Sequence, residues 1–164
     1  MPDKFAHCTF CGARFTPGQR WPRRCAACGE TSYQNPKPVA VAVQPVGTGL
    51  LVVRRGIPPA RDRLALPGGY IDVGETWQSA AARELFEEVG IKTDPASVRH
   101  FDTVSAPDGT LLVFALFPDA VSVPPSAPNE ETLGWEILYS PTELGFSIHT
   151  AVANRFFTPA RPSL

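Results

Sequence analysis

Four cysteines near the N-terminus place the tightest constraint on how this chain can fold. They form two Cys-x2-Cys pairs separated by thirteen residues: Cys8, Cys11, Cys25 and Cys28. A two-residue gap lets one turn present both sulfurs, and four thiolates suit a tetrahedral zinc ion. Gly12 and Gly29 follow the pairs and allow the chain to turn under the metal. Because four thiolates leave no position for a catalytic water, we expect a structural zinc ribbon.

The alternative is a pair of disulfides in a small secreted domain. The start, Met1 to Lys4, leads into no apolar segment of the kind that begins a secretory signal. A reducing cytosol opposes disulfides, so we favour zinc and a cytoplasmic protein. About 35 residues bury too little apolar surface to fold alone, which explains the need for a metal. His7 precedes Cys8 and is expected to be a solvated loop residue.

The composition changes near Asn35-Pro36-Lys37-Pro38, which predicts a zinc ribbon over 1–35 and a second domain over 36–164. The first segment carries five basic and two acidic residues, and the second carries ten basic and fourteen acidic ones. The net charge of −1 does not favour nucleic acid as a partner, although Arg20, Trp21, Arg23 and Arg24 mix basic and aromatic side chains. The longest apolar run is too short to cross a bilayer, so no membrane partner is expected.

The remaining chain alternates strand and helix signals. β-Branched and apolar runs predict strands, and the first two, joined by a turn at 47–49, predict a hairpin. One long helix has Thr76 as its N-cap and Gly90 at its C-terminal end. The expected strands are 39–43, 50–54, 64–66, 98–104, 111–117 and 133–139, and the expected helices are 76–89 and 148–157. These elements predict an α+β layered domain.

The long helix carries an unusual group of acidic side chains. Ala82, Leu85 and Val89 form an apolar face that we expect to pack on the sheet. Three glutamates form a second cluster near the C-terminal end, where the helix dipole disfavours anions: Glu84, Glu87 and Glu88. A divalent cation would make this cluster favourable, since hard cations bind carboxylate oxygens. The alternative is a solvated acidic face with Arg83 as its counterion.

A glycine-rich turn, 66–75, leads directly into this helix. Together they read Gly69-x5-Glu75-x7-Arg83-Glu84-Leu85-x-Glu87-Glu88-x-Gly90-Ile91, which resembles the complete Nudix box. The flanking segments 33–37 and 50–55 resemble the zinc-ribbon branch of that family, which includes NADH pyrophosphatases and some ADP-ribose/FAD pyrophosphatases. The resemblance implies an α/β/α sandwich that follows an N-terminal zinc ribbon. It also implies a Mg2+- or Mn2+-dependent enzyme that hydrolyses a nucleoside diphosphate linked to another moiety.

Matching positions to the box suggests a function for each of its residues. Glu84, Glu87 and Glu88 resemble the metal ligands, with the Gly68 carbonyl as a further ligand. Gly69 belongs to the box turn, and Glu75 and Arg83 resemble its structural ion pair. Fixed ligand geometry would explain the need for such a pair.

The general base and the substrate residues are less constrained. A base must lie within hydrogen-bond reach of the attacking water, and many Nudix enzymes supply it from a later loop. Glu130 and Glu131 follow a proline-rich loop, and we favour Glu131, with Glu84 as the rival. Arg54 and Arg55 end a strand near the expected site, so one of them is a candidate for binding phosphate. Phe146 is a candidate for stacking on a base, although a lone aromatic side chain is more often a core residue.

Several alternatives for substrate and function stay open. The NADH-specific branch carries Ser-Gln-Pro-Trp-Pro-Phe-Pro downstream of the box, whereas this chain has Ser105-Ala-Pro-Asp-Gly there. We therefore expect an ADP-ribose- or FAD-type dinucleotide, with NADH as the alternative. A different class of function is a non-catalytic nucleotide sensor whose ribbon contacts nucleic acid or protein. The sequence leaves a homodimer open.

Overall fold

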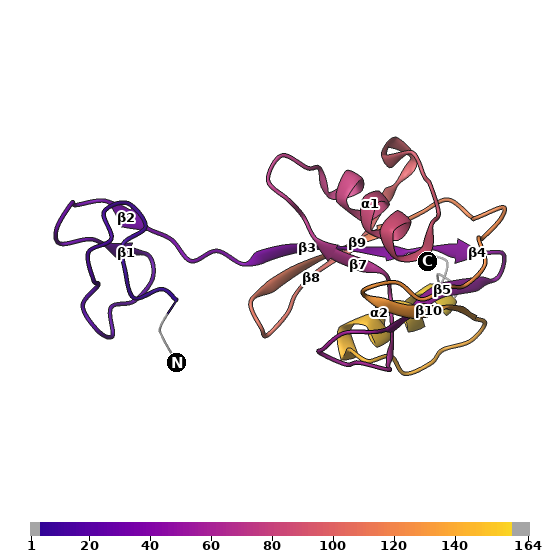
Figure 1. Cartoon of the computed structure of the whole chain (residues 1–164). Coiled ribbons are helices and arrows are strands. Elements are labelled where there is room, and N and C mark those ends of the chain that lie inside the picture. The colour runs from indigo at the N-terminus through magenta and orange to yellow at the C-terminus, as the bar shows by residue number, and fades with distance from the viewer. Residues whose placement is uncertain (1–3, 159–164) are drawn as a thin grey trace, which may run out of the picture. The chain divides into compact units, whose positions relative to one another are not determined.

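The structure is a computed structural model that describes residues 4–158. The chain divides between Pro36 and Lys37 into two compact units, and each is described by itself. Figure 1 shows the course of the chain through both units. No helix among the described residues is long and apolar enough to cross a membrane.

The N-terminal unit is small and contains little regular structure. Strand β1 (Arg23–Arg24) pairs with β2 (Thr31–Ser32) in an antiparallel arrangement. Its core consists of Cys8, Phe15 and Cys25, against which Trp21 packs. His7 is exposed, as expected for a loop histidine.

Two sheets form the centre of the second unit. The first has the order β7-β3-β9-β8, in which only the β3–β9 pair is parallel. It contains β3 (Lys37–Val43), β7 (Gly68–Tyr70), β8 (Arg99–Ser105) and β9 (Thr110–Leu116). The second has the order β10-β5-β4, and β6 also pairs with β5. It contains β4 (Pro45–Val46), β5 (Gly49–Arg55), β6 (Leu64–Ala65) and β10 (Thr132–Leu138).

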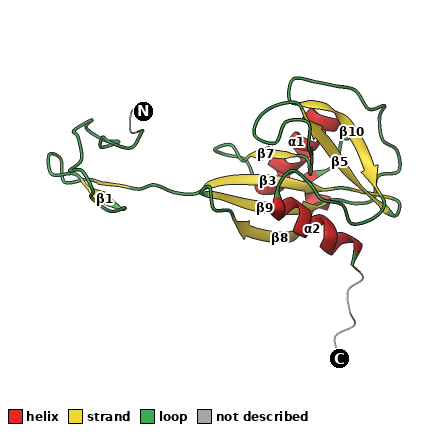
Figure 2. Cartoon of the chain, turned by 90° about the horizontal axis from the view of Figure 1, so that it is seen from below, coloured by secondary structure: helices red, strands yellow, loops and turns green. Residues whose placement is uncertain are grey.

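The two sheets together form the central layer of the second unit, and helices cover both faces of this layer. Helix α1 (Trp77–Val89) and helix α2 (Ser147–Phe157) lie on opposite sides of it (Figures 1 and 2), and a short 3-10 helix, η1 (Pro95–Ser97), follows α1. In β3, Ala40 and Ala42 belong to the core cluster that contains α1, whereas Val41 and Val43 belong to the cluster that contains α2. Because successive side chains of a strand point to opposite faces, burial of both faces requires the continuous apolar run found in the sequence. The predicted α/β/α sandwich is therefore confirmed.

The predicted turn at 47–49 is confirmed, since it joins β4 to β5 in an antiparallel hairpin, but the predicted pairing of 39–43 with 50–54 is wrong. β5 pairs with the short β4, β6 and β10, while β3 pairs with β7 and β9 in the other sheet. The chain leaves the first sheet at Gln44, whose buried amide donates to the carbonyl oxygens of Pro45 and Pro118 at 2.6 and 2.9 Å. Pro45 has no N–H with which to continue the ladder of β3. The strand therefore ends there, and the chain crosses to the second sheet.

The other predicted elements agree with the structure to within one or two residues, but β7 lies in the segment expected to be a turn and was not predicted, nor were β1, β2 and β4. Helix α1 has Thr76 as its N-cap, whose side chain accepts a hydrogen bond from the Ser79 N–H at 3.1 Å. It ends at Gly90, whose φ of 84° is the left-handed conformation of a helix C-cap. Strands β8, β9 and β10 are each shifted by one residue from the predicted 98–104, 111–117 and 133–139.

Candidate active site

The acidic cluster of α1 is partly buried rather than solvated. Glu84 and Glu88 are both 7% exposed and lie beside the predicted apolar face, whereas the side chain of Glu87 is 55% exposed. Burial raises the pKa of Glu84, and it raises the pKa of Glu88 to about 8 even though Glu88 Oε2 accepts a hydrogen bond from the Gly68 N–H at 3.1 Å. Two buried carboxylates on one helix favour a neighbouring cation or a proton. A solvated acidic face does not describe this helix.

Arg83 connects the box residues through a network of charged hydrogen bonds. Its Nε and Nη2 donate to the two carboxylate oxygens of Glu75 at 2.8 and 2.9 Å. Its Nη1 donates to Glu84 Oε1 at 2.7 Å and to Glu87 Oε2 at 3.1 Å, and Nη2 also donates to the Tyr70 carbonyl oxygen. The hydrogen bonds from Arg83 lower the pKa of Glu75 to about 2. The network orients Glu84 and Glu87 relative to the β7 backbone.

The two glycines of β7 allow backbone and carboxylates to approach closely. A Cβ on Gly69 would lie 2.6 Å from Glu84 Oε2 and closer still to its Oε1 and Cδ. A Cβ on Gly68 would lie 2.8 Å from Val41 Cα and overlap the Ala40 carbonyl. At Gly68 the neighbours are backbone atoms, so space requires glycine there. At Gly69 they are the carboxyl atoms of Glu84, which a larger residue would displace.

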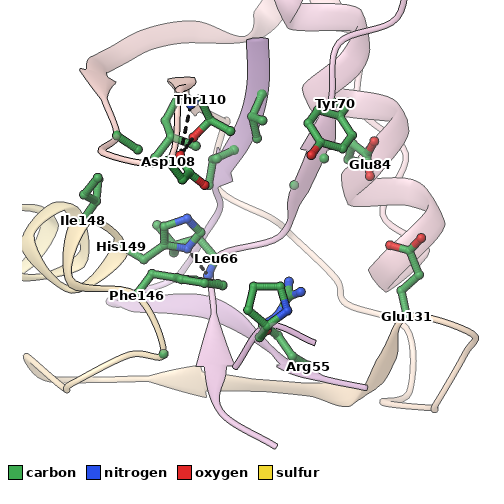
Figure 3. Close-up of a pocket in the computed structure, with 18 of the residues that line it drawn as sticks. Arg55, Leu66, Tyr70, Glu84, Asp108, Thr110, Glu131, Phe146, Ile148 and His149 are labelled. Atoms are coloured by element: carbon green, nitrogen blue, oxygen red, sulfur yellow. Dashed lines mark hydrogen bonds between the residues drawn. The ribbon is translucent and has the colours of Figure 1, made fainter. Parts of the chain in front are cut away.

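A cavity of about 870 Å³ extends from α1 toward the start of α2. Figure 3 shows Glu84 and Glu131 at the side of α1, and Phe146, Ile148 and His149 at the opposite side. Glu131 lies in the loop that precedes β10, and its charge further raises the pKa of Glu84 and of Glu88. The cavity thus has an acidic side and an apolar, aromatic side. Glu130, the neighbour of Glu131, does not line it.

The two neighbouring arginines of β5 have different surroundings. Arg55 lines the cavity, donates from Nε to the Pro59 carbonyl oxygen at 2.8 Å, and lies with its Cζ 5.3 Å from the centre of the Phe146 ring. Arg54 does not line the cavity and instead pairs with Glu136 at 2.7 Å. Adjacent residues of a strand face opposite sides, which accounts for the difference. The structure therefore brings Arg55 and Phe146 together and leaves Arg54 outside.

Several lining residues were not identified from the sequence, among them Tyr70, Asp108 and His149. Tyr70 ends β7, Asp108 lies between β8 and β9, and His149 lies in the first turn of α2. They come from separate elements and share no spacing that a sequence pattern reveals. A single histidine in an amphipathic helix is the only signal, and it does not distinguish a core residue from a cavity residue.

The four cysteines converge in the N-terminal unit. Their sulfur atoms all lie within 4.8 Å of one another, and Cys8–Cys28 and Cys11–Cys25 are separated by 3.8 and 3.7 Å. Backbone hydrogen bonds from Cys11 and from Phe10, whose N–H donates to Cys8 Sγ at 3.4 Å, lower the pKa of Cys8 to about 6. This arrangement fits a tetrahedral, thiolate-rich metal centre.

The carboxylates of α1 do not converge in the same manner. Among residues 4–158, the cysteines form the only group of three or more histidine, cysteine or acidic ligand atoms that lie this close together. Glu84 and Glu87 bind Arg83, and Glu88 binds the Gly68 N–H. A cation at this end of the cavity would compete with the arginine for Glu84 and Glu87.

Comparison with known proteins gives consistent matches. The NUDIX domain model matches residues 35–158. A protein named NAD-capped RNA hydrolase NudC from Deinococcus radiodurans is 30% identical over 134 residues, which cover 77% of this chain and 48% of that protein. The protein of the same name from Chromobacterium violaceum is 28% identical over 132 residues, which cover 77% of this chain and 49% of that protein. The chain thus spans about half the length of these curated relatives.

Solved structures share the fold. A NUDIX hydrolase from Nitrosomonas europaea matches with a TM-score of 0.68 and 24% identity, covering 92% of this chain and 89% of that chain. The NUDIX domain of Shewanella oneidensis NrtR, solved with ADP ribose, matches with a TM-score of 0.54 and 17% identity. The match covers 64% of this chain and 73% of that chain. At these identities the likeness concerns the fold.

Proposed function

The chain belongs to the Nudix family, and from this premise we propose that it hydrolyses the pyrophosphate bond of a nucleoside diphosphate linked to another moiety. The observation that carries the proposal is a pair of buried carboxylates: Glu84 lines the cavity, and Glu88 is buried one helical turn further along α1. The opposite side of the cavity is lined by Phe146 and Ile148. A pyrophosphate is repelled by bare carboxylates and attracted once divalent cations lie between them. The cavity volume suits a nucleotide-sized ligand.

We propose that Glu84, Glu87, Glu88 and the Gly68 carbonyl oxygen hold Mg2+ or Mn2+. The fit rests on the donor set, since two buried carboxylates supply hard oxygen ligands and a raised pKa that a cation would lower again. When bound, such a cation supplies charge neutralisation for the pyrophosphate and activation of a water molecule. Arg83 and Glu75 act as positioning residues, because their network keeps Glu84 at the β7 backbone.

We propose Glu131 as the general base, with Glu84 as the second candidate. Glu131 faces the same cavity from a separate loop and has no ion pair among the described residues, so its carboxylate is available to accept a proton. Glu84 is already engaged by Arg83 at 2.7 Å. Arg55 is placed to bind a phosphate oxygen, since its guanidinium lies in the cavity.

Glu130 offers a matched control for the base. Glu131→Gln should lower kcat by on the order of 100-fold or more, whereas Glu130→Gln, a neighbour outside the cavity, should leave it unchanged. If both variants retain wild-type kcat, the proton acceptor is Glu84 rather than Glu131.

For the substrate we propose an ADP-ribose- or FAD-type dinucleotide, with an NADH-type dinucleotide as the alternative. The curated relatives are named as hydrolases of NAD-capped RNA. The test is a panel of ADP-ribose, FAD, NADH, coenzyme A and nucleoside triphosphates, with Mg2+ or Mn2+ and chromatography of the products. Release of AMP from a dinucleotide supports the proposal. Binding without any hydrolysis would instead support a nucleotide sensor.

We further propose that the cysteine cluster holds a structural zinc ion. Four sulfur ligands complete a tetrahedral shell and leave no open position for chemistry. Reduced thiolates of this kind also fit a cytoplasmic location, which we propose on the same ground.

A further inference from the structure

His149 is a buried polar residue at the side of the cavity away from α1. Only 8% of it is exposed, and its ring lies between Phe114 and Phe146, with centroid distances of 5.8 and 5.1 Å. It nevertheless lines the cavity. A polar side chain in such a position requires a partner for each of its polar atoms.

One of its two ring nitrogens is paired within the protein. The backbone N–H of Leu66 donates to Nδ1 at 3.2 Å, so Nδ1 carries no proton. Burial, together with the positive charge of Arg55, lowers the pKa of His149 to about 4, and the ring is therefore neutral near pH 7. In a neutral imidazole with an unprotonated Nδ1, the proton is on Nε2.

The Nε2–H group has no such partner. Among residues 4–158, no group accepts a hydrogen bond from it. Figure 3 shows the second ring nitrogen pointing away from Leu66, toward the side of the cavity where Asp108 lies. The fold thus holds one hydrogen-bond donor, with a fixed tautomer, aimed into the cavity.

The surroundings indicate what this donor would meet. Phe146, Leu112 and Ile148 supply flat and apolar surface, which suits a planar ring. The carboxylate of Asp108, bound through Oδ1 to the Thr110 N–H and hydroxyl at 3.0 and 2.8 Å, supplies an acceptor. A donor and an acceptor together match a heterocycle whose edge carries an acceptor next to an amino group.

We propose that this part of the cavity binds an adenine base and that the His149 Nε2–H donates to one of its ring nitrogens. Adenine places an N7 acceptor beside its N6 amino group, whereas the corresponding edge of guanine carries two acceptors and would oppose Asp108. The inference rests on the proposed function, because the pyrophosphate lies toward the carboxylates of α1 and its base extends toward α2. His149 is thus a specificity-determining residue.

The variant His149→Asn distinguishes the contributions of the two ring nitrogens. An asparagine oxygen reproduces the position of Nδ1 and can accept from the Leu66 N–H, while the donor at the Nε2 position is lost. The probes are AMP and its 1-deaza, 3-deaza and 7-deaza analogues, each with one ring nitrogen replaced by C–H, measured by calorimetry with Mg2+. Wild type should bind one analogue about ten-fold more weakly than AMP, and His149→Asn should bind that analogue and AMP equally.

Three results would overturn the inference. They are equal binding of all four probes by wild type, a preference for AMP that persists in His149→Asn, and binding of IMP as tight as that of AMP. If His149→Asn does not fold, NMR of wild type replaces it. AMP should then shift the Nε2–H proton of His149 and slow its exchange with solvent, and an unchanged signal would count against the inference.

The experiment also separates this inference from the proposed function. Binding of AMP requires no turnover, so a protein that hydrolyses no dinucleotide but loses AMP preference in His149→Asn refutes only the hydrolase. A protein that releases AMP from ADP-ribose but shows no dependence on the ring nitrogens refutes only the base site.

Discussion

Gly69→Ala is the most informative single change near the acidic side of the cavity. An added Cβ would lie 2.6 Å from Glu84 Oε2 and closer still to its Oε1, whereas ordinary contacts begin at 3.4 Å, so the carboxylate must retreat by about 1 Å. Glu84 is buried and is held by Arg83 at 2.7 Å, which prevents it from turning aside without breaking that bond. Gly69 does not adopt a positive φ, so backbone strain does not contribute.

A displacement of about 1 Å in a catalytic constellation lowers rates by about 100-fold. We therefore expect Gly69→Ala to lower kcat by about that factor and to weaken Mn2+ binding, measured by electron paramagnetic resonance, while the domain stays folded. A Gly69→Ala variant that keeps kcat within three-fold of wild type and binds Mn2+ normally would show that Glu84 is not displaced from a catalytic position.

Gly74→Ala is the control in the same loop. Gly74 has a φ of 95° and no atom within 4 Å of an added Cβ, so alanine there introduces strain without touching Glu84. It should lower the melting temperature, at a cost of about 1–2 kcal/mol, and leave kcat unchanged. A large loss of kcat in Gly74→Ala would show that loop strain, not contact with Glu84, governs the rate.

Three further predictions concern other parts of the chain. The pKa of His149 is about 4 when folded and near 6.5 when unfolded, so between these values the unfolded state binds more protons at this residue. The raised pKa of Glu88 acts in the opposite direction, so the prediction concerns the difference between two proteins. From pH 6.5 to pH 4 the free energy of unfolding of wild type, measured with urea, should fall by about 3 kcal/mol relative to that of His149→Asn. An equal change in both proteins would contradict the buried, neutral ring. Removing zinc with a strong chelator should collapse the amide NMR dispersion of residues 4–36 and leave that of 37–158 intact, and an unchanged 4–36 spectrum would argue against a structural metal. Glu75→Gln should lower kcat about ten-fold with little change in KM, since it frees Arg83 to rearrange Glu84 and Glu87; unchanged kcat would remove the positioning role.

The parts of the fold that depend on local chemistry could be predicted from the sequence. Thr76 and Gly90 delimit α1 because both caps are made by neighbouring residues. The hairpin prediction failed because the partner of β3 in the parallel register is β9, some seventy residues later, and nothing local encodes that pairing. The end of β3 at Pro45 was visible in the sequence, but where the chain went next was not.

The candidate site, too, could be predicted from the sequence only in part. Glu84, Glu87 and Glu88 follow from helical spacing, but the burial of Glu84 and Glu88 depends on how β7 packs on α1. Which of Arg54 and Arg55 enters the cavity depends on the strand's orientation in the sheet, which the sequence does not specify. The function proposed for His149 could not be predicted from the sequence, because it depends on a hydrogen bond from Leu66, which lies 83 residues earlier.

The central claim is that the buried glutamates of α1 support metal-dependent pyrophosphate hydrolysis. The direct measurement is AMP release from the dinucleotide substrate found in the panel, for wild type and Glu88→Gln, with and without Mg2+ or Mn2+. We predict that hydrolysis requires the divalent cation and that Glu88→Gln lowers kcat by on the order of 100-fold to 1,000-fold while the fold is retained. Hydrolysis that proceeds without a divalent cation, or at the wild-type rate in Glu88→Gln, would contradict the account.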